Sequence, residues 1–229
     1  RNFNLKKGEQ LKLDPILVEK SYAIDQVVVT GTLKESFIKV SPVKVEVLTS
    51  NFLKKIPTNN IMEIMESVNG VQNQINCGVC GTSDIHINGM EGPYSLILID
   101  GMPIMSSLST VYGLNGIPTS LIKQIEIIKG PNSTLYGSEA IAGVINIITN
   151  KPEDISKLEI ASFISSDREK NIDLSWSPKW EKVNMLLSAN LFNMNHFIDR
   201  NEDNFSDEVL SKRLSIFNKW SFNRKNEKV

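Results

Sequence analysis

The stretch that most constrains the fold is residues 121–150, LIKQIEIIKGPNSTLYGSEAIAGVINIITN. It begins with a run of alternating apolar and polar residues, continues through a segment with three glycines and Pro131, and ends with a second run of β-branched residues. Alternation with a period of two is typical of strands, and glycine with proline marks turns. The stretch therefore predicts a strand, a glycine-rich loop and a second strand.

A phosphate-binding loop is the first alternative for this glycine-rich segment. Such a loop has Lys and then Ser or Thr directly after its last glycine, whereas Ser138 and Glu139 follow Gly137 here. The formal net charge of −1 also gives the chain no bulk attraction for DNA or RNA. We therefore expect neither a nucleotide site in this loop nor a nucleic-acid partner.

Two upstream segments extend the pattern, since residues 84–90 are DIHINGM and residues 96–104 are LILIDGMPI. In this order, the three segments resemble the plug domain of TonB-dependent outer-membrane receptors. The resemblance implies an α+β plug domain with a mixed sheet and short helices. Antiparallel strands of a transmembrane β-barrel are expected to follow it, so that the chain is a fragment of a larger barrel.

The resemblance also implies a division of the chain into four parts. These are residues 1–20, the remnant of an N-terminal β-sandwich; 21–40, a TonB box and linker; 41–152, the plug; and 153–229, the first four strands of the barrel. Because the chain opens at Arg1 without an initiator Met or an apolar leader, any signal peptide is expected to lie outside it. A plug held inside a barrel needs tight turns and close backbone approach, which assigns structural roles to Gly89, Gly101, Gly130, Gly137 and Gly143.

Residues 23–32, AIDQVVVTGT, contain three consecutive valines and favour an extended strand. An ordinary edge strand is one interpretation. The position just before the plug instead resembles a TonB box, an extended segment that leaves its host and adds as a strand to the sheet of the partner TonB. The residues assigned to this box are Asp25, Gln26, Val27, Val28, Val29 and Thr30.

The start of the predicted plug combines one strand with two short helices. The strand is expected over residues 43–48, and the first helix over 51–56, where Pro57 stops it. The second helix is expected from Asn59 or Asn60 to Ser67, with its apolar residues on one face. Met62 and Met65 on that helix are interpreted as core residues rather than ligands.

The only two cysteines form the segment CGVC at Cys77 and Cys80. A small disulfide ring is the favoured interpretation, because a periplasmic or surface domain lies in an oxidising compartment. A thioredoxin-type redox site is disfavoured, since glycines surround the motif instead of a helix. A Cu(I) site with methionine ligands is the third interpretation, because thiolate and thioether ligands select that ion.

The resemblance places two loops, residues 73–83 and 102–112, toward the extracellular ligand cavity. The residues assigned to this ligand-facing surface are Cys77, Cys80, Met102, Met105 and Tyr112. His86 and Lys129 stand where the family usually has arginine, and neither side chain can form the bidentate contacts of a guanidinium. We expect no resident cofactor, although a transported metal chelate would occupy this surface.

From residue 156 onward the pattern changes to longer alternating runs. Four strands are predicted, with apolar residues largely on one face and polar residues on the other. No run approaches the roughly 20 apolar residues that a membrane helix needs, whereas barrel strands require only the observed alternation. The predicted polar inner face implies a hydrated, exchangeable contact with the plug. The apolar face carries Leu158, Ile160, Ile172, Leu174, Trp176, Val183, Met185, Leu187, Ala189, Leu191, Leu210, Leu214, Ile216 and Trp220.

The resemblance implies TonB-dependent import of a scarce ligand across the outer membrane, with a ferric siderophore or other metal chelate favoured. Copper, haem, cobalamin and oligosaccharide are alternatives. The implied partners are TonB with its inner-membrane energy-coupling partners, outer-membrane lipid and the small-molecule ligand, with the plug and N-terminal segment accessible from the periplasm. Two other classes are weaker: a periplasmic binding or adhesion module, and an enzyme, for which the surroundings of His86 and His196 show no Ser or Asp pattern typical of a catalytic site.

Overall fold

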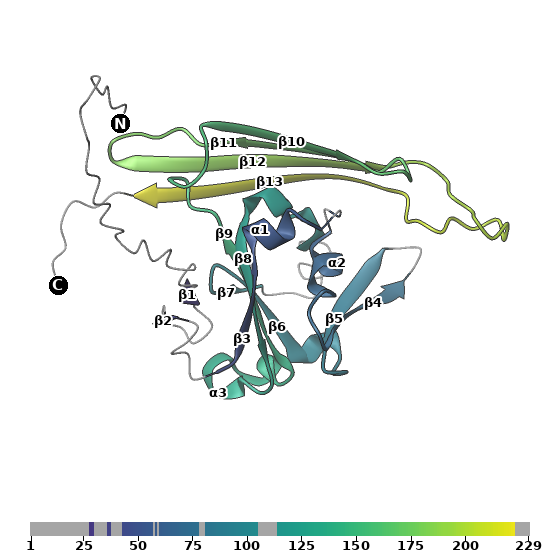
Figure 1. The fold of residues 1–229 in the computed structure, drawn as a ribbon, viewed down its shortest axis with the longest axis horizontal. Coiled ribbons are helices and arrows are strands. Elements are labelled where there is room, and N and C mark those ends of the chain that lie inside the picture. Colours follow the sequence, from purple (N-terminus) through teal and green to yellow (C-terminus); the bar gives the residue numbers. More distant parts are fainter. Residues whose placement is uncertain are drawn as a thin grey trace, which may run out of the picture.

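The computed structural model describes residues 28–29, 36–37, 43–56, 58, 60–77, 81–104 and 114–222. The expected β-sandwich remnant lies outside these residues, as do Asp25, Gln26, Val27, Thr30, Cys80, Met105 and Tyr112. The described elements form a five-stranded sheet with short helices and a hairpin beside it, and a four-stranded sheet that lies across one end of it (Figure 1).

The five-stranded sheet has the strand order β3-β8-β9-β6-β7. Strands β6 and β9 are parallel and all other neighbours are antiparallel, which confirms the predicted mixed sheet. The two strands predicted within residues 121–150 are β8 and β9, and they lie next to each other in the sheet. The strands are β3 (Val45–Thr49), β8 (Ile122–Lys129), β9 (Gly143–Thr149), β6 (Ser95–Ile99) and β7 (Met102–Pro103).

Strand β8 departs from the alternation expected of it, because it is buried on both faces. Ile127 and Ile128 are neighbours in sequence, yet both are buried. One face of the sheet packs on α1 (Ser50–Leu53), α2 (Ile61–Met65) and the hairpin of β4 (Val71–Cys77) and β5 (Thr82–Ile87). The opposite face packs on Ala140 and Tyr136. A sheet covered on both sides favours continuous apolar runs over strict alternation.

The two helices are shorter than predicted. The helix expected over 51–56 is α1 (Ser50–Leu53), and the helix expected to reach Ser67 is α2 (Ile61–Met65). Beyond α2 the chain tightens into turns in which Ser67 N donates to Ile64 O at 3.1 Å. Asn60 caps α2, because its side chain accepts a hydrogen bond from Met62 N at 3.0 Å. Met62 is fully buried, as expected for a core residue.

A separate hairpin consists of β4 (Val71–Cys77) and β5 (Thr82–Ile87), with a bulge between Ile75 and Cys77. The short strands β1 (Val28–Val29) and β2 (Ser36–Phe37) pair antiparallel. Short 3-10 turns and helix α3 (Ser133–Tyr136) complete the described chain. None of the helices in this part of the chain has the length and apolar run needed to cross a membrane.

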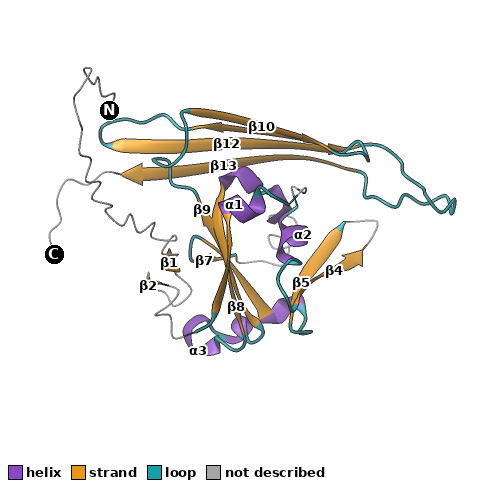
Figure 2. Ribbon diagram, viewed as in Figure 1, coloured by secondary structure: helices purple, strands orange, loops and turns teal. Residues whose placement is uncertain are grey.

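The four strands predicted after residue 156 are present as an antiparallel meander, here called the wall sheet (Figure 2). Its inner face, toward the five-stranded sheet, carries buried polar residues such as Asn171, Asp173, Ser188 and Asn190. Its outer face is apolar and exposed. The strands are β10 (Leu158–Ile164), β11 (Lys170–Trp176), β12 (Val183–Met194) and β13 (Ser211–Phe222). On the predicted apolar face, Met185 is buried; it lies opposite Trp220 of β13, and its backbone N donates to Pro178 O.

Candidate functional site

A tight turn at Asp100 and Gly101 connects β6 to β7. The two residues have φ angles of 50° and 80°, so both adopt the left-handed conformation that Asp-Gly favours in two-residue hairpins. Asp100 N donates to Ile147 O at 2.9 Å, and Gly101 N donates to Asn146 Oδ1 at 3.0 Å. These bonds fix the turn against the neighbouring strand β9.

The Asp100 carboxylate points along the end of β9 and accepts two hydrogen bonds from one residue. Thr149 N donates to Oδ1 at 2.8 Å, and the Thr149 hydroxyl donates to Oδ2 at 2.6 Å. Thr149 is buried. Hydrogen bonds to an ionised carboxylate are stronger than neutral ones, so this arrangement holds the charged group in one orientation.

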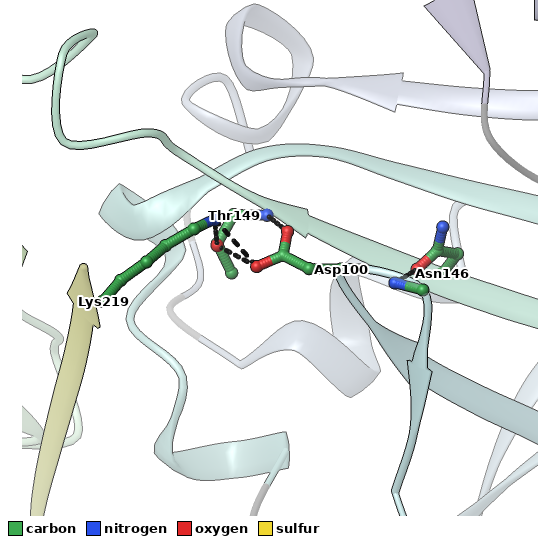
Figure 3. Close-up of polar contacts among 5 residues, drawn as sticks. Asp100, Asn146, Thr149 and Lys219 are labelled. Atoms are coloured by element: carbon green, nitrogen blue, oxygen red, sulfur yellow. Dashed lines mark hydrogen bonds and ion pairs between the residues drawn. The ribbon is translucent and has the colours of Figure 1, made fainter. Parts of the chain in front are cut away.

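Lys219 of the wall sheet completes this cluster (Figure 3). Its Nζ lies 2.9 Å from Asp100 Oδ2 and 2.7 Å from Thr149 Oγ1. The Asp100 and Lys219 side chains are 26% and 25% exposed, so the ion pair is partly shielded from water. We call the three residues Asp100, Thr149 and Lys219 the junction, because they join the five-stranded sheet to β13.

Apart from the junction, the contact between the two sheets combines one apolar cluster with polar contacts. Its apolar part is a cluster of Leu121, Ile155 and Leu186 with Phe217 packed against it. Its polar part includes Ser120 Oγ, which donates to Asp173 Oδ2 at 3.5 Å. A contact of this composition resists sliding less than a continuous apolar core, because its polar groups can exchange protein partners for water.

The segment between β9 and β10 is tied to the wall sheet by hydrogen bonds. Ser177 Oγ donates to Pro152 O at 2.7 Å, and Asn184 Nδ2 donates to Glu153 Oε1 at 2.8 Å. A side-chain hydrogen bond from Ser221, helped by the one from Asn184, lowers the pKa of Glu153 against an opposing effect of burial. Pro152 and Glu153, just after β9, are therefore held against the wall sheet.

Of the residues predicted to face a ligand, Cys77 and Met102 lie within the described part of the chain. Cys77 is disulfide-bonded and lies at the end of β4, whereas Met102 is 70% exposed beside the Asp100–Gly101 turn, well away from that end of the hairpin (Figure 1). Met105, Tyr112 and Cys80, the other cysteine of the chain, lie outside the described residues. Among the described residues, no three His, Cys, Asp or Glu side chains are grouped so as to hold a metal ion.

The turn after the cysteines instead lies against the long loop between β12 and β13. A Cβ added at Gly81 would lie 3.1 Å from Val209 Cγ1 of that loop. Of the two residues that replace a family arginine, Lys129 pairs with Glu46 Oε1 at 2.9 Å and also donates to the carbonyl oxygen of Asn69. His86 of β5 lies opposite Gln72 of β4. Lys129 therefore ties the edge strand β3 and the segment before β4 to β8.

Comparison with known proteins fits this architecture. A family model described as TonB-dependent Receptor Plug Domain matches residues 38–144. These residues are a TonB-dependent receptor plug domain. The matched residues include the β4–β5 hairpin and the five-stranded sheet as far as the start of β9, and the antiparallel wall sheet follows them in the chain.

Two curated relatives of this chain are described as a transporter and a receptor. Over 151 residues, 66% of this chain and 25% of the relative, the chain is 30% identical to the vitamin B12 transporter BtuB of Vibrio vulnificus. Over 140 residues, 56% of this chain and 19% of the relative, it is 34% identical to the ferric enterobactin receptor PirA of Pseudomonas aeruginosa. The chain spans about a quarter or less of the length of these relatives.

Solved structures of receptors also match this chain. The siderophore receptor PirA from Pseudomonas aeruginosa matches 81% of this chain and 33% of its own, with a TM-score of 0.55 and 25% identity. The receptor FpvA of P. aeruginosa matches 74% of this chain and 22% of its own, with a TM-score of 0.63. At 19% identity, the second match shows a shared fold of plug and following strands.

Proposed function

We propose that this chain is part of a TonB-dependent outer-membrane receptor that imports a scarce ligand, with a ferric siderophore or other metal chelate favoured. The observation that carries the proposal is a plug domain held against the polar face of a sheet whose other face is apolar and exposed. Relatives described as a ferric enterobactin receptor and a vitamin B12 transporter support it. Cobalamin, haem, copper and oligosaccharide are the alternative ligands.

The outer face of the wall sheet has the properties of a lipid-facing surface. On β13, the outward residues from Leu214 to Phe222 span about 27 Å at roughly 3.4 Å per residue. A strand tilt of roughly 40° reduces this to about 20 Å, close to the apolar band of outer-membrane barrels. Trp176, Trp180 and Trp220 are half-exposed toward one end, where such barrels place an aromatic girdle. These features support an outer-membrane location.

The proposed transport step uses the plug as a movable barrier. Val28 and Val29 of the TonB box pair with Ser36–Phe37, and TonB would replace this short pairing by adding its own strand. Force applied at this end would reach the plug, whose contact with the wall sheet is partly polar. The junction is the contact that has to open if the plug moves away from β13.

We further propose that the chain binds and transports its ligand without changing it chemically. The relatives are receptors and a transporter rather than enzymes. The junction groups are engaged with one another, and they serve as a structural contact.

The test is uptake by the full-length receptor, expressed in a host strain that lacks its own receptors for the probes. Radiolabelled ferric enterobactin and cobalamin are supplied to cells with and without functional TonB. We expect accumulation of at least one probe only when TonB is functional. Accumulation independent of TonB, or recovery of the receptor in the soluble periplasmic fraction, would contradict the proposal and favour a periplasmic binding module.

A variant of the TonB box separates binding from transport. Val28→Pro removes a backbone N–H and disfavours strand pairing, so it should abolish uptake while surface binding of the probe is retained. The matched control is Ser36→Ala, which changes a residue of the paired strand β2 and keeps its backbone donor. Loss of binding together with uptake in Val28→Pro would show that the segment has a different role.

A further inference from the structure

Two lysines and an asparagine form a row across three strands of the wall sheet. Lys170 of β11 lies opposite Asn193 of β12, which lies opposite Lys212 of β13. Register partners on neighbouring strands project from the same face, and here it is the outer face. Both lysines are exposed there. This end of the sheet thus presents two cations on either side of Asn193, next to a largely apolar surface.

An aliphatic row lies directly beside the cationic row. Ile172, Leu191 and Leu214 are register partners two residues further along the same three strands, and they are 47%, 51% and 63% exposed. A hollow of about 520 Å³ is lined by both rows. The side chains that line this hollow change from cationic to apolar within two residues along each strand.

Further cationic groups surround the charged end of this hollow. An adjoining hollow of about 210 Å³ is lined by Arg168, Lys170, Asn193 and His196, among others. Within the described residues, Arg168, Lys170 and Lys212 form no ion pair. Two acidic residues flank Arg168 in sequence: Asp167 is bound by Arg200 at 2.7 Å, and the partly buried Glu169 interacts with the charge of Arg213. The positive charge at this end is therefore not neutralised by these acids.

The asparagine in the row has unused hydrogen-bonding capacity. The Oδ1 atom of Asn193 is buried and has no hydrogen-bond partner among the described residues. Asn193 lines both hollows, between the two lysines. An amide that offers a donor and an acceptor at this position suits a ligand that carries both anionic oxygens and hydroxyl groups.

We propose that these rows bind a phosphorylated glycolipid of the membrane, with its phosphate between Lys170 and Lys212 and an acyl chain on Ile172, Leu191 and Leu214. Lysine binds phosphate as a point charge, and the aliphatic row accounts for a lipid rather than a free anion. The site rests on the proposed membrane position of the wall sheet. It lies at the end of the sheet opposite the tryptophans and remote from β1 and β2, which places it in the outer leaflet (Figure 1).

The test uses the full-length receptor in nonionic detergent micelles with a fluorescent diphosphoryl lipid A as the probe. Lys170→Gln with Lys212→Gln should weaken binding of the probe by about tenfold or more, because two charge-assisted contacts are lost. The double variant Lys170→Arg with Lys212→Arg should retain binding of the probe. The matched control is Lys157→Gln with Lys182→Gln, which removes two exposed lysines near the other end of the sheet and should change the affinity by less than about twofold.

Competition separates a lipid site from an ion site. Unlabelled lipid A should displace the probe, whereas millimolar inorganic phosphate should not. Equal probe binding by the Gln variant and the wild type, or complete displacement by phosphate, would overturn the proposal. Outer-membrane fractionation and TonB-dependent uptake of the same proteins are measured in parallel. If the receptor fractionates with the outer membrane and transports normally but shows no lysine-dependent lipid binding, the proposed lipid site is wrong and the proposed function stands.

Discussion

Asp100 and Lys219 lie 119 residues apart in sequence and are joined by an ion pair of 2.9 Å. The first residue belongs to a hairpin turn of the plug and the second to the last strand of the wall sheet. Thr149 bridges them, since its hydroxyl donates to Asp100 and accepts from Lys219. The relationship makes the junction the most specific contact between the two parts of the chain.

Replacing Lys219 by Met should loosen the plug. The change removes both bonds of Nζ while Asp100 keeps its bonds to Thr149, so we expect a loss of about 1–2 kcal/mol in the free energy of plug unfolding. The measurement is the urea dependence of trypsin cleavage within the plug of the full-length receptor. Lys212→Met, on the opposite face of the same strand, is the control and should leave the urea midpoint unchanged. A double-mutant cycle with Asp100→Asn should yield a coupling energy of about 1 kcal/mol, and a coupling of zero would show that the pair contributes nothing.

Gly143→Ala should destabilise the plug strongly. A Cβ at Gly143 would lie 2.4 Å from Ile128 O in the neighbouring strand β8, so the two central strands would have to separate. We expect a loss of about 2–4 kcal/mol in the same urea experiment. Gly89→Ala is the control, because Gly89 also has a positive φ but no atom near its Cβ position. This variant should lose about 1 kcal/mol in the free energy of unfolding. Similar losses for both variants would mean that backbone conformation, and not close approach, sets the requirement.

The disulfide of Cys77 should stabilise the hairpin end without binding the ligand. Thiol titration of the denatured, unreduced protein should find no free cysteine, because the chain has two cysteines and Cys77 is bonded. Closing so small a ring is worth about 2 kcal/mol in the chain-entropy model. Cys77→Ser with Cys80→Ser should therefore lower resistance to proteolysis near this turn and leave ferric enterobactin or cobalamin affinity unchanged. A variant that loses copper binding alone would instead identify the pair as a metal site.

Glu169, in the connection between β10 and β11, should give the contact with the plug a pH dependence. Burial raises the pKa of this carboxyl, and the nearby charges of Glu63 and Glu208 raise it further, while Arg213 opposes them. Because the folded pKa lies above the ordinary value of 4.5, protonation favours the folded state, and this contribution is lost as the pH rises through the folded pKa. Glu169→Gln should therefore raise the urea midpoint at neutral pH and have little effect below about pH 4.5. An unchanged midpoint at pH 7 would show that the three carboxylates do not interact.

Much of the fold could be predicted because it depends on local patterns. The strand, loop and strand of residues 121–150 and the four later strands follow from alternation and glycine placement. Helix lengths were wrong by one turn, since Ser67 and its neighbours adopt tight turns that have the same composition as a helix end. The burial of both Ile127 and Ile128 also escaped prediction, because it depends on what covers each face of the sheet.

The junction could not be predicted from the chain alone. Asp100 lies in a recognised motif, but Thr149 and Lys219 are ordinary residues of a strand end and of a polar face. Only the register of β12 with β13 and the placement of the wall sheet bring Lys219 to the plug. The ligand-facing role of Cys77 and Met102 stays a prediction, because Cys80, Met105 and Tyr112 lie outside the described residues.

The position of β9 has a consequence for the order in which the chain folds. This strand is the last of the plug sheet in sequence, yet it lies between β8 and β6 and is the only link between the β3-β8 pair and the β6-β7 hairpin in the described sheet. Until residues 143–149 are available, the sheet exists as two separate halves with unpaired edges, and such non-local pairing is slow to form. The β3-β8 pair and the β6-β7 hairpin therefore become one sheet only after the segment just before the first wall strand has been added.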